Sequence, residues 1–173
     1  MPTIKKFSDS KDMAHSFFVK SRYFLQSSLD LYKMRQKELS PDITFGLLLV
    51  HGIELALKSF ILVKNPGIDI KTIKDRFGHN YKKTYKYCLT LDKDGIIKDD
   101  KLKQLINTLS DKFFFDTIDA RFPKGSSKHF FPHNTFVILK EKLMDPMPLI
   151  FGPDRRKKTA EISFKEKEGL SFL

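Results

Sequence analysis

The stretch from Ile43 to Val63 is apolar on nearly every face of a helix and constrains the fold more than any other segment. It follows Ser40-Pro41-Asp42, which suits an N-cap and the first helical position, and it ends at Asn65-Pro66-Gly67. A helix of this kind lies either in the centre of a protein core or across a membrane.

Three polar side chains interrupt this stretch: His51, Glu54 and Lys58. Ionisable groups in the middle of a span cost several kcal/mol on insertion scales, so we expect a buried helix of a soluble protein and no membrane contact. The N-terminal MPTIKKFSDS lacks the apolar run of a secretory signal, and the single cysteine fits a reducing compartment. We therefore expect a cytoplasmic protein.

Apolar residues at three- and four-residue steps predict further helices on both sides of the central one. We expect a long first helix over Asp9–Gln36, with Ser8, Asp9 or Ser10 as its cap, and a last helix over Asn134–Met144. Between them we expect a helical turn over Ile70–Gly78, a helix from Asn80 to about Leu91, and a helix starting near Asp99 or Asp100 that buries Leu102, Leu105, Ile106 and Leu109.

These elements predict an all-α, up-and-down bundle of four or more helices. The chain has 173 residues, which is enough for one domain, and we place its helical part at residues 1–150. Residues 151–173 have little apolar patterning, and we expect a basic C-terminal tail or a small surface appendage.

Positive charge is in excess, with 32 Lys and Arg against 21 Asp and Glu and a net charge of +11. Such a charge attracts polyanions, of which nucleic acid is the obvious one. The excess is concentrated in two segments, 71–87 and 155–158. The cations that we expect to contact nucleic acid are Lys71, Lys74, Arg76, Lys82, Lys83 and Lys86 in the first segment, and Arg155, Arg156, Lys157 and Lys158 in the second.

Tyr81, Tyr85 and Tyr87 are interleaved with the first group of cations. Two interpretations are open. The tyrosines stack on the bases of a single strand beside a positive groove, or they turn inward from a solvated helix face, as the helical spacing of Tyr81, Tyr85 and Cys88 favours.

His51, Glu54 and Lys58 fall at i, i+3 and i+7, so they form one polar stripe on the apolar helix. Buried charges need partners. The stripe therefore holds either an internal Glu54–Lys58 pair with His51 nearby, or a ligand-facing pocket. As a metal site it is weak, because the remaining histidines lie at no diagnostic spacing, and we expect no metal and no cofactor.

Gly78-His79-Asn80 predicts a turn followed by a helix start, with Asn80 as the cap. His79 either reaches back to Glu54 as a structural bridge or acts as a general acid or base. Cys88 is expected to be a buried thiol. Arg121 either pairs with a local carboxylate or contacts phosphate.

Three strings occur in order along the chain: His51-Gly52-Ile53-Glu54-Leu55-Ala56-Leu57-Lys58, Phe77-Gly78-His79-Asn80-Tyr81 and Arg121-Phe122-Pro123. Together they resemble a branch of the HEPN superfamily over roughly Met13 to Met144. That branch shows Glu-x-x-x-Lys on a long helix, Gly-His-Asn/Asp-Leu at the next helix start and Arg-Tyr-Pro later. The resemblance implies a helical bundle, often a homodimer. It also implies that the catalytic members cut RNA without a metal, using an Arg and a His separated by four to six residues.

The chain departs from that catalytic spacing. No His follows any Arg at the required distance; Arg121 and His129 come closest, with seven residues between them, and are the weak catalytic candidates. His129 is otherwise a loop residue.

Three functions are therefore open, with the balance leaning away from an enzyme. The leading one is a non-catalytic HEPN-like protein that binds RNA, a nucleotide or a partner protein through the basic segment and the polar residues His51, Glu54, Lys58, His79 and Arg121. The second is a metal-independent ribonuclease of the toxin or defence type. The third is a structural or regulatory bundle that dimerises through exposed phenylalanines.

Overall fold

The computed structural model describes residues 6–35, 43–119 and 134–151, and the side chains of 11–34, 45–110 and 134–151. All regular structure in these ranges is helical, so the predicted all-α bundle is confirmed. The helices are α1 (Lys6–Arg35), α2 (Ile43–Lys64), α3 (Ile70–Phe77), α4 (Tyr81–Leu91), α5 (Asp100–Asp119) and α6 (Thr135–Leu139). A π-helical turn over Lys140–Met144 continues α6, and a 3-10 turn over Met147–Ile150 follows it.

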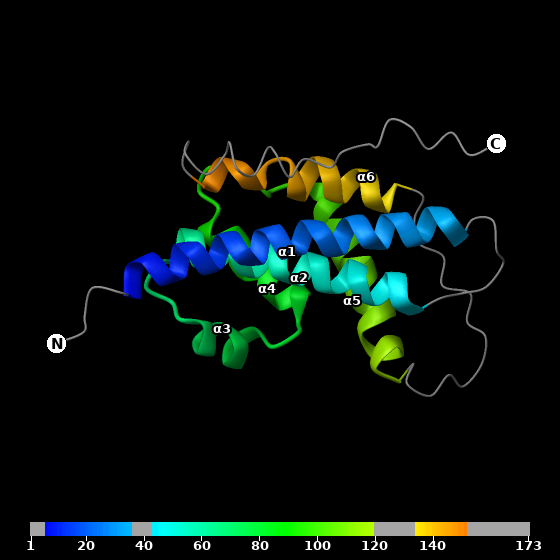
Figure 1. The fold of residues 1–173 in the computed structure, drawn as a ribbon, viewed down its shortest axis with the longest axis horizontal. Helices are drawn as coiled ribbons and strands as arrows, with labels where there is room; N and C mark the ends of the chain where they lie inside the picture. Colours follow the sequence, from blue (N-terminus) through cyan, green and yellow to red (C-terminus); the bar gives the residue numbers. More distant parts are fainter. Residues whose placement is uncertain (1–5, 36–42, 120–133, 152–173) are drawn as a thin grey trace.

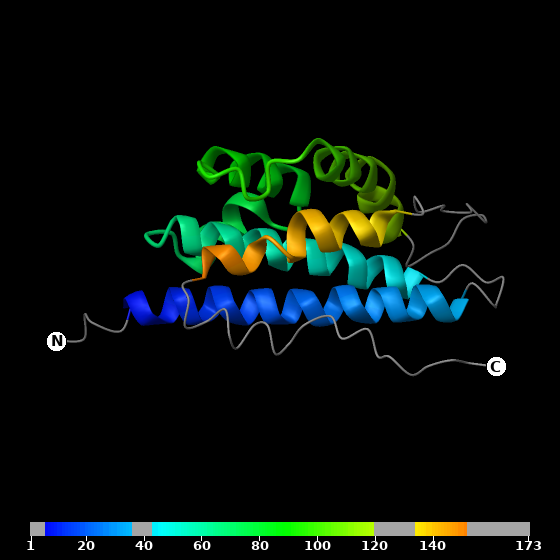
Figure 2. The same cartoon turned by 90° about the horizontal axis from the view of Figure 1, so that it is seen from above.

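The helices form layers that are seen edge-on in Figure 2. α1 makes one outer layer, α2 and α6 lie in the middle, and α4 and α5 cover the other side. Figure 1 shows α3 at the edge of the bundle, joined to α2 and α4 by short connections. α2 is thus the central element, as its apolar sequence predicts.

α1 and α2 run antiparallel and pack closely. Two buried serines tie them together near opposite ends: the Ser59 hydroxyl donates to the Ala14 carbonyl at 2.6 Å, and the Ser28 hydroxyl donates to the Phe45 carbonyl at 2.7 Å. Gly52 lies at the close approach, where an added Cβ would come within 2.7 Å of Leu25 Cγ. A side chain at that position requires the Leu25 side chain or the α1 backbone at Ser21 to move.

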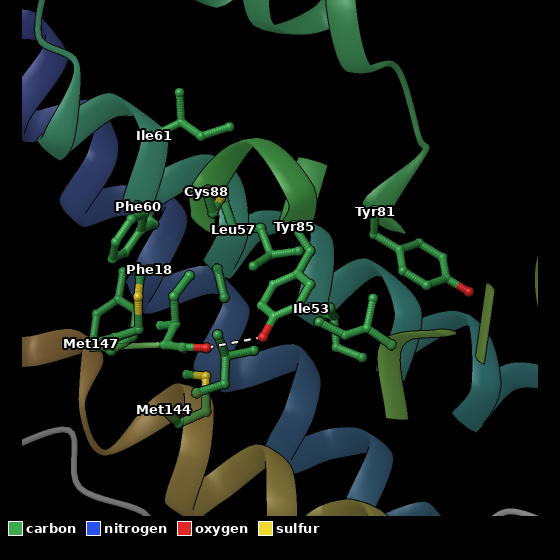
Figure 3. Packing of buried hydrophobic residues seen from close by; sticks show 14 of the residues in the cluster. Phe18, Ile53, Leu57, Phe60, Ile61, Tyr81, Tyr85, Cys88, Met144 and Met147 are labelled. Atoms are coloured by element: carbon green, nitrogen blue, oxygen red, sulfur yellow. Dashed lines mark hydrogen bonds between the residues drawn. The ribbon is translucent and has the colours of Figure 1, made fainter. Parts of the chain in front are cut away.

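The core is continuous across the layers. Figure 3 shows part of it, with Leu57 and Phe60 of α2, Tyr85 and Cys88 of α4 and the C-terminal methionines in one cluster. The four apolar residues predicted to be buried on α5 are buried. The interior is therefore shared by elements from the whole length of the described chain.

Several predicted boundaries hold because they depend on local capping. α2 ends at Lys64, before Asn65-Pro66-Gly67. The Asn80 side chain accepts from the Lys83 amide at 2.8 Å and begins α4, and the Asp99 side chain accepts from the Leu102 amide at 3.0 Å before α5. Each carboxylate or amide oxygen satisfies an amide that the first turn leaves without a helical partner.

Two expectations at the ends of the bundle need correction. α1 begins at Lys6, so the predicted caps Ser8, Asp9 and Ser10 lie inside the helix. Phe151, placed in the tail by the sequence, is buried and packs against the Phe18 ring with centroids 5.5 Å apart. Its burial means that the core extends one residue beyond the expected boundary.

Candidate functional site

The polar stripe of α2 contains a buried ion pair. The Lys58 ammonium donates to Glu54 Oε1 at 2.5 Å, and the Glu54 and Lys58 side chains are only 5% and 10% exposed. In such surroundings each charge depends on the other, because removing one leaves an uncompensated buried charge. The predicted internal pair is confirmed.

The turn between α3 and α4 contacts this pair. Its position in the chain is set by residues that end α3 and begin α4. Asp69 caps α3 by accepting from the Thr72 amide at 2.7 Å. Gly78 ends α3 with φ 52° and ψ −124°, a conformation that residues other than glycine rarely adopt. Its amide donates to the Lys74 carbonyl. Asn80 then starts α4.

Two contacts join this turn to α2. The Lys58 ammonium donates to the Gly78 carbonyl at 2.7 Å, and His79 Nδ1 lies 3.1 Å from Glu54 Oε2. The second contact is the one that the sequence predicted as a bridge from His79 back to Glu54. We call Glu54, Lys58, His79 and the nearby His51 the polar cluster.

The two histidines of the polar cluster are the parts that reach solvent. The His79 side chain is 76% exposed while its Nδ1 faces the buried carboxylate. An ionised carboxylate can only accept, so in this contact with ionised Glu54 the Nδ1–H of His79 donates. His51 is about half exposed, with Nδ1 3.9 Å from Glu54 Oε2 and its ring edge-on to Phe24.

Beside the polar cluster, α3 and α4 carry the first group of cations that the sequence singled out. We call this set the basic face: Lys71, Lys74, Arg76, Lys82, Lys83 and Lys86. All are exposed except Lys82, which is partly exposed. Asp75 is the one carboxylate within segment 71–87. The side chains of Lys71, Lys74 and Lys86 make no hydrogen bond or ion pair with the described residues.

Arg76 and Lys83 join the two helices of the basic face. The Arg76 guanidinium lies over the Tyr87 ring at 4.5 Å from its centroid and near the Phe77 ring at 5.4 Å. The Lys83 ammonium donates to the Arg76 carbonyl at 2.7 Å. Stacking on an aromatic ring fixes the plane of the guanidinium, so its hydrogen-bond donors are held in a defined direction.

The tyrosines between these cations turn inward. Tyr81 is 1% exposed and Tyr85 is 3% exposed. The Tyr85 hydroxyl donates to the Ile97 carbonyl at 3.0 Å, and burial raises the pKa of Tyr85 to about 12. These two rings are therefore unavailable for stacking on bases, and the inward alternative is confirmed.

Cys88 is fully buried as predicted, and burial, with a smaller contribution from Asp92, raises the pKa of its thiol well above the usual value. A protonated, inaccessible thiol is neither a nucleophile nor a metal ligand. Across the described residues, no group of His, Cys, Asp and Glu side chains is placed to hold a metal ion.

Several predicted site residues lie outside the described residues: Arg121, His129 and the second basic group, Arg155, Arg156, Lys157 and Lys158. The structure therefore brings together the α2 stripe, His79 and the first basic group, and leaves the other candidates as predictions.

Two buried polar features, one in the site and one on α1, had little or no sequence signal. The bond from Lys58 to the Gly78 carbonyl depends on the tertiary return of α3 to α2. Arg22 is buried in α1, where desolvation lowers its pKa and the charge of Asp145 opposes that shift. The only hint in the sequence was a cation amid the apolar positions of the first helix.

Comparisons with protein-family models, curated proteins and solved structures give no match. One described helix, over Phe45–Lys64, is long and apolar enough to cross a membrane, and 67% of that stretch is buried inside the protein. Core helices of soluble proteins meet the same criterion. The arguments about function therefore rest on the polar cluster and the basic face.

Proposed function

We propose that the protein binds nucleic acid, RNA in the first place, through the basic face, and that it acts as a binding module of HEPN-like type. The observation that carries this proposal is the group of exposed cations on α3 and α4, three of which have no anionic partner among the described residues. Cations held at a surface without compensating carboxylates favour a polyanion, and they release its condensed counterions on binding.

The polar cluster supports the basic face from beneath. Lys58 and Glu54 hold the turn that connects α3 to α4, so the two cationic helices keep a fixed relation to α2. A rigid support reduces the conformational entropy lost on binding. In this proposal Glu54 and Lys58 are positioning residues and do not contact the ligand.

The proposal is tested by fluorescence anisotropy with a labelled RNA at about 50 and 200 mM salt. The variant replaces Lys71, Lys74 and Lys86 by Gln. A matched control replaces Lys98, Lys101 and Lys103, which are also exposed, and removes the same charge from another surface. If the lysines contact phosphates, the first variant binds at least about tenfold more weakly and its salt slope falls by about 3.

The control variant is expected to bind within about threefold of the parent, because its three lysines lie on α5 and just before it and outside the basic face of α3 and α4. Equal losses in both variants would show a response to net charge alone and would contradict a defined face. No salt-sensitive binding of any nucleic acid would remove the proposal and leave a nucleotide or an acidic protein as the ligand to test.

A second candidate, a metal-independent ribonuclease, is favoured by the geometry of His79. An exposed imidazole with one nitrogen held by a buried carboxylate is oriented for proton transfer. Incubation of RNA in chelator, with His79→Ala and His129→Ala compared with the parent, tests this candidate. Cleavage that is lost in either variant supports it, and intact RNA at high protein concentration rejects it.

A further inference from the structure

The aromatic side chains around the basic face are already engaged within the protein. Phe77, Tyr81 and Tyr85 are buried. Tyr87 is partly buried, its ring is covered by Arg76, and its hydroxyl accepts from the Asn65 amide at 3.2 Å. Proteins that bind single strands stack successive bases on several exposed aromatic rings. Among the rings of segment 71–87 only the His79 imidazole is exposed, and its Nδ1 is held by Glu54.

The amide side chains that could contact base edges here are also committed. Asn80 uses its carbonyl oxygen to cap α4, and Asn65 donates to Tyr87. Direct readout of bases relies on such amides, or on an Arg or Lys side chain that enters a groove, and a flexible lysine ammonium otherwise acts as a point charge on phosphate. The Arg76 guanidinium instead lies over Tyr87 at 4.5 Å, against the surface of its own protein.

What the face presents is therefore mainly charge: five exposed cations, one of them a planar guanidinium held over a ring, on two helices that contact each other. Side chains of this kind contact phosphate oxygens, which position a protein on nucleic acid without reading its sequence. Double-stranded nucleic acid carries about one charge per 1.7 Å of its axis, so it offers the most phosphate to a small cationic surface.

We infer that the basic face recognises the sugar–phosphate backbone of a duplex, independently of base sequence, in preference to the bases of a single strand. This inference rests on the proposed function and names the ligand class for the same site. It also assigns Arg76 a distinct part, as the oriented donor among lysines that act as point charges.

The test is a competition assay on the full chain. A labelled duplex RNA of about 16 base pairs is displaced by the same unlabelled duplex, by one of its strands, and by single-stranded poly(U), poly(C) and poly(A). At equal phosphate concentration we expect the duplex to compete at least about fivefold better than its single strand. The three homopolymers should agree within about twofold, because stacking differs among bases and backbone contact does not.

Salt and two variants sharpen the result. With at most six cations on the face, the slope of log affinity against log salt for the duplex should not exceed about 5 in magnitude. Arg76→Lys keeps the charge and loses the planar fork; we expect it to weaken duplex binding by about threefold or more with little change in the salt slope. Tyr87→Leu, which removes the ring beneath Arg76, should have an effect of similar size.

The outcomes separate this inference from the proposed function. Tighter binding of the single strand, or affinities that differ by tenfold among the homopolymers, would overturn duplex backbone recognition while nucleic-acid binding stands. Binding to none of the competitors would overturn both. Duplex preference that survives in the Lys71, Lys74 and Lys86 glutamine variant would place the contact elsewhere and would also contradict the inference.

Discussion

The polar cluster and the basic face are neighbours on α2, α3 and α4, yet their charges differ in burial and in pairing. In the polar cluster the Glu54–Lys58 pair is buried, and both groups have a second partner on the turn before α4. On the basic face five of the six cations are exposed, and the side chains of three of these have no partner in the described part of the chain. Charges that are paired and buried hold a fold together, whereas exposed and unpaired charges are available to a ligand.

A second ion pair, between Lys64 and Asp94, shows that a short distance without burial does not make a pair strongly stabilising. Lys64 at the end of α2 donates to Asp94 at 2.6 Å, a distance close to that of the Lys58–Glu54 bond. The Lys64 ammonium lowers the pKa of the Asp94 carboxyl. The Asp94 side chain is 65% exposed, however, so water screens this interaction. Burial, more than distance, is what separates the two pairs energetically.

The largest expected effect comes from breaking the buried pair. Lys58→Met leaves Glu54 buried with His79 alone and takes the donor from the Gly78 carbonyl, so we expect a loss of about 3 kcal/mol in the free energy of unfolding. Urea denaturation followed by circular dichroism measures it. Lys64→Met is the matched control, and it should cost less than about 1 kcal/mol.

The double variant Glu54→Leu, Lys58→Met separates charge from shape. It removes both buried charges and keeps similar volumes, so most of the lost stability should return. If the double variant is less stable than Lys58→Met, the pair is not a self-contained unit, and the contacts of Glu54 with the two histidines contribute more than the bond to Lys58.

The contrast between the two regions also marks what the sequence can predict. The helix ends at Lys64, Asn80 and Asp99 follow from local capping, and the inward positions of Tyr81, Tyr85 and Cys88 follow from helical period. These features depend on a few neighbouring residues, so a linear pattern specifies them.

Features that depend on the tertiary path were predicted less completely. The i, i+4 spacing predicts that Glu54 faces Lys58, but not that Lys58 also reaches the Gly78 carbonyl. Tyr87 shares its segment with Tyr81 and Tyr85, and only the packing of α3 on α4 determines that Arg76 covers its ring. Phe151 follows a proline-containing turn, and its return to Phe18 has no local signal.

Tyr85 offers a second, smaller test, because it belongs to the helix of the basic face but points into the core. Tyr85→Phe removes the donor to the buried Ile97 carbonyl and should cost about 1 to 2 kcal/mol near pH 8. The folded protein raises the pKa of Tyr85 to about 12, against about 10 in an unfolded chain. Between these values the unfolded state loses the proton and the folded state keeps it, so the stabilisation is present below pH 10 and falls above it.

The stability gap between the parent and Tyr85→Phe should therefore shrink by about 1 kcal/mol from pH 8 to pH 11. Denaturant titrations of both proteins across this range measure it, and other ionising groups affect the two proteins equally. A gap that stays constant to pH 11 would contradict the burial of the hydroxyl and with it the inward orientation of the α4 tyrosines.

The smallest expected effect on stability is on the basic face itself. Replacing Lys71, Lys74 and Lys86 by Gln should change the free energy of unfolding by no more than about 0.5 kcal/mol, because exposed substitutions between good helix formers are nearly neutral. The effects of the α3 dipole on these lysines also oppose each other. Lys71 lies near the positive N-terminal end, where a cation is unfavourable, and Lys74 lies in the last turn, where a cation is favourable. Urea denaturation of this variant beside Lys58→Met gives the comparison directly. A loss above about 1.5 kcal/mol would mean that these lysines stabilise the fold. It would contradict the assignment of a structural role to the polar cluster and a binding role to the basic face.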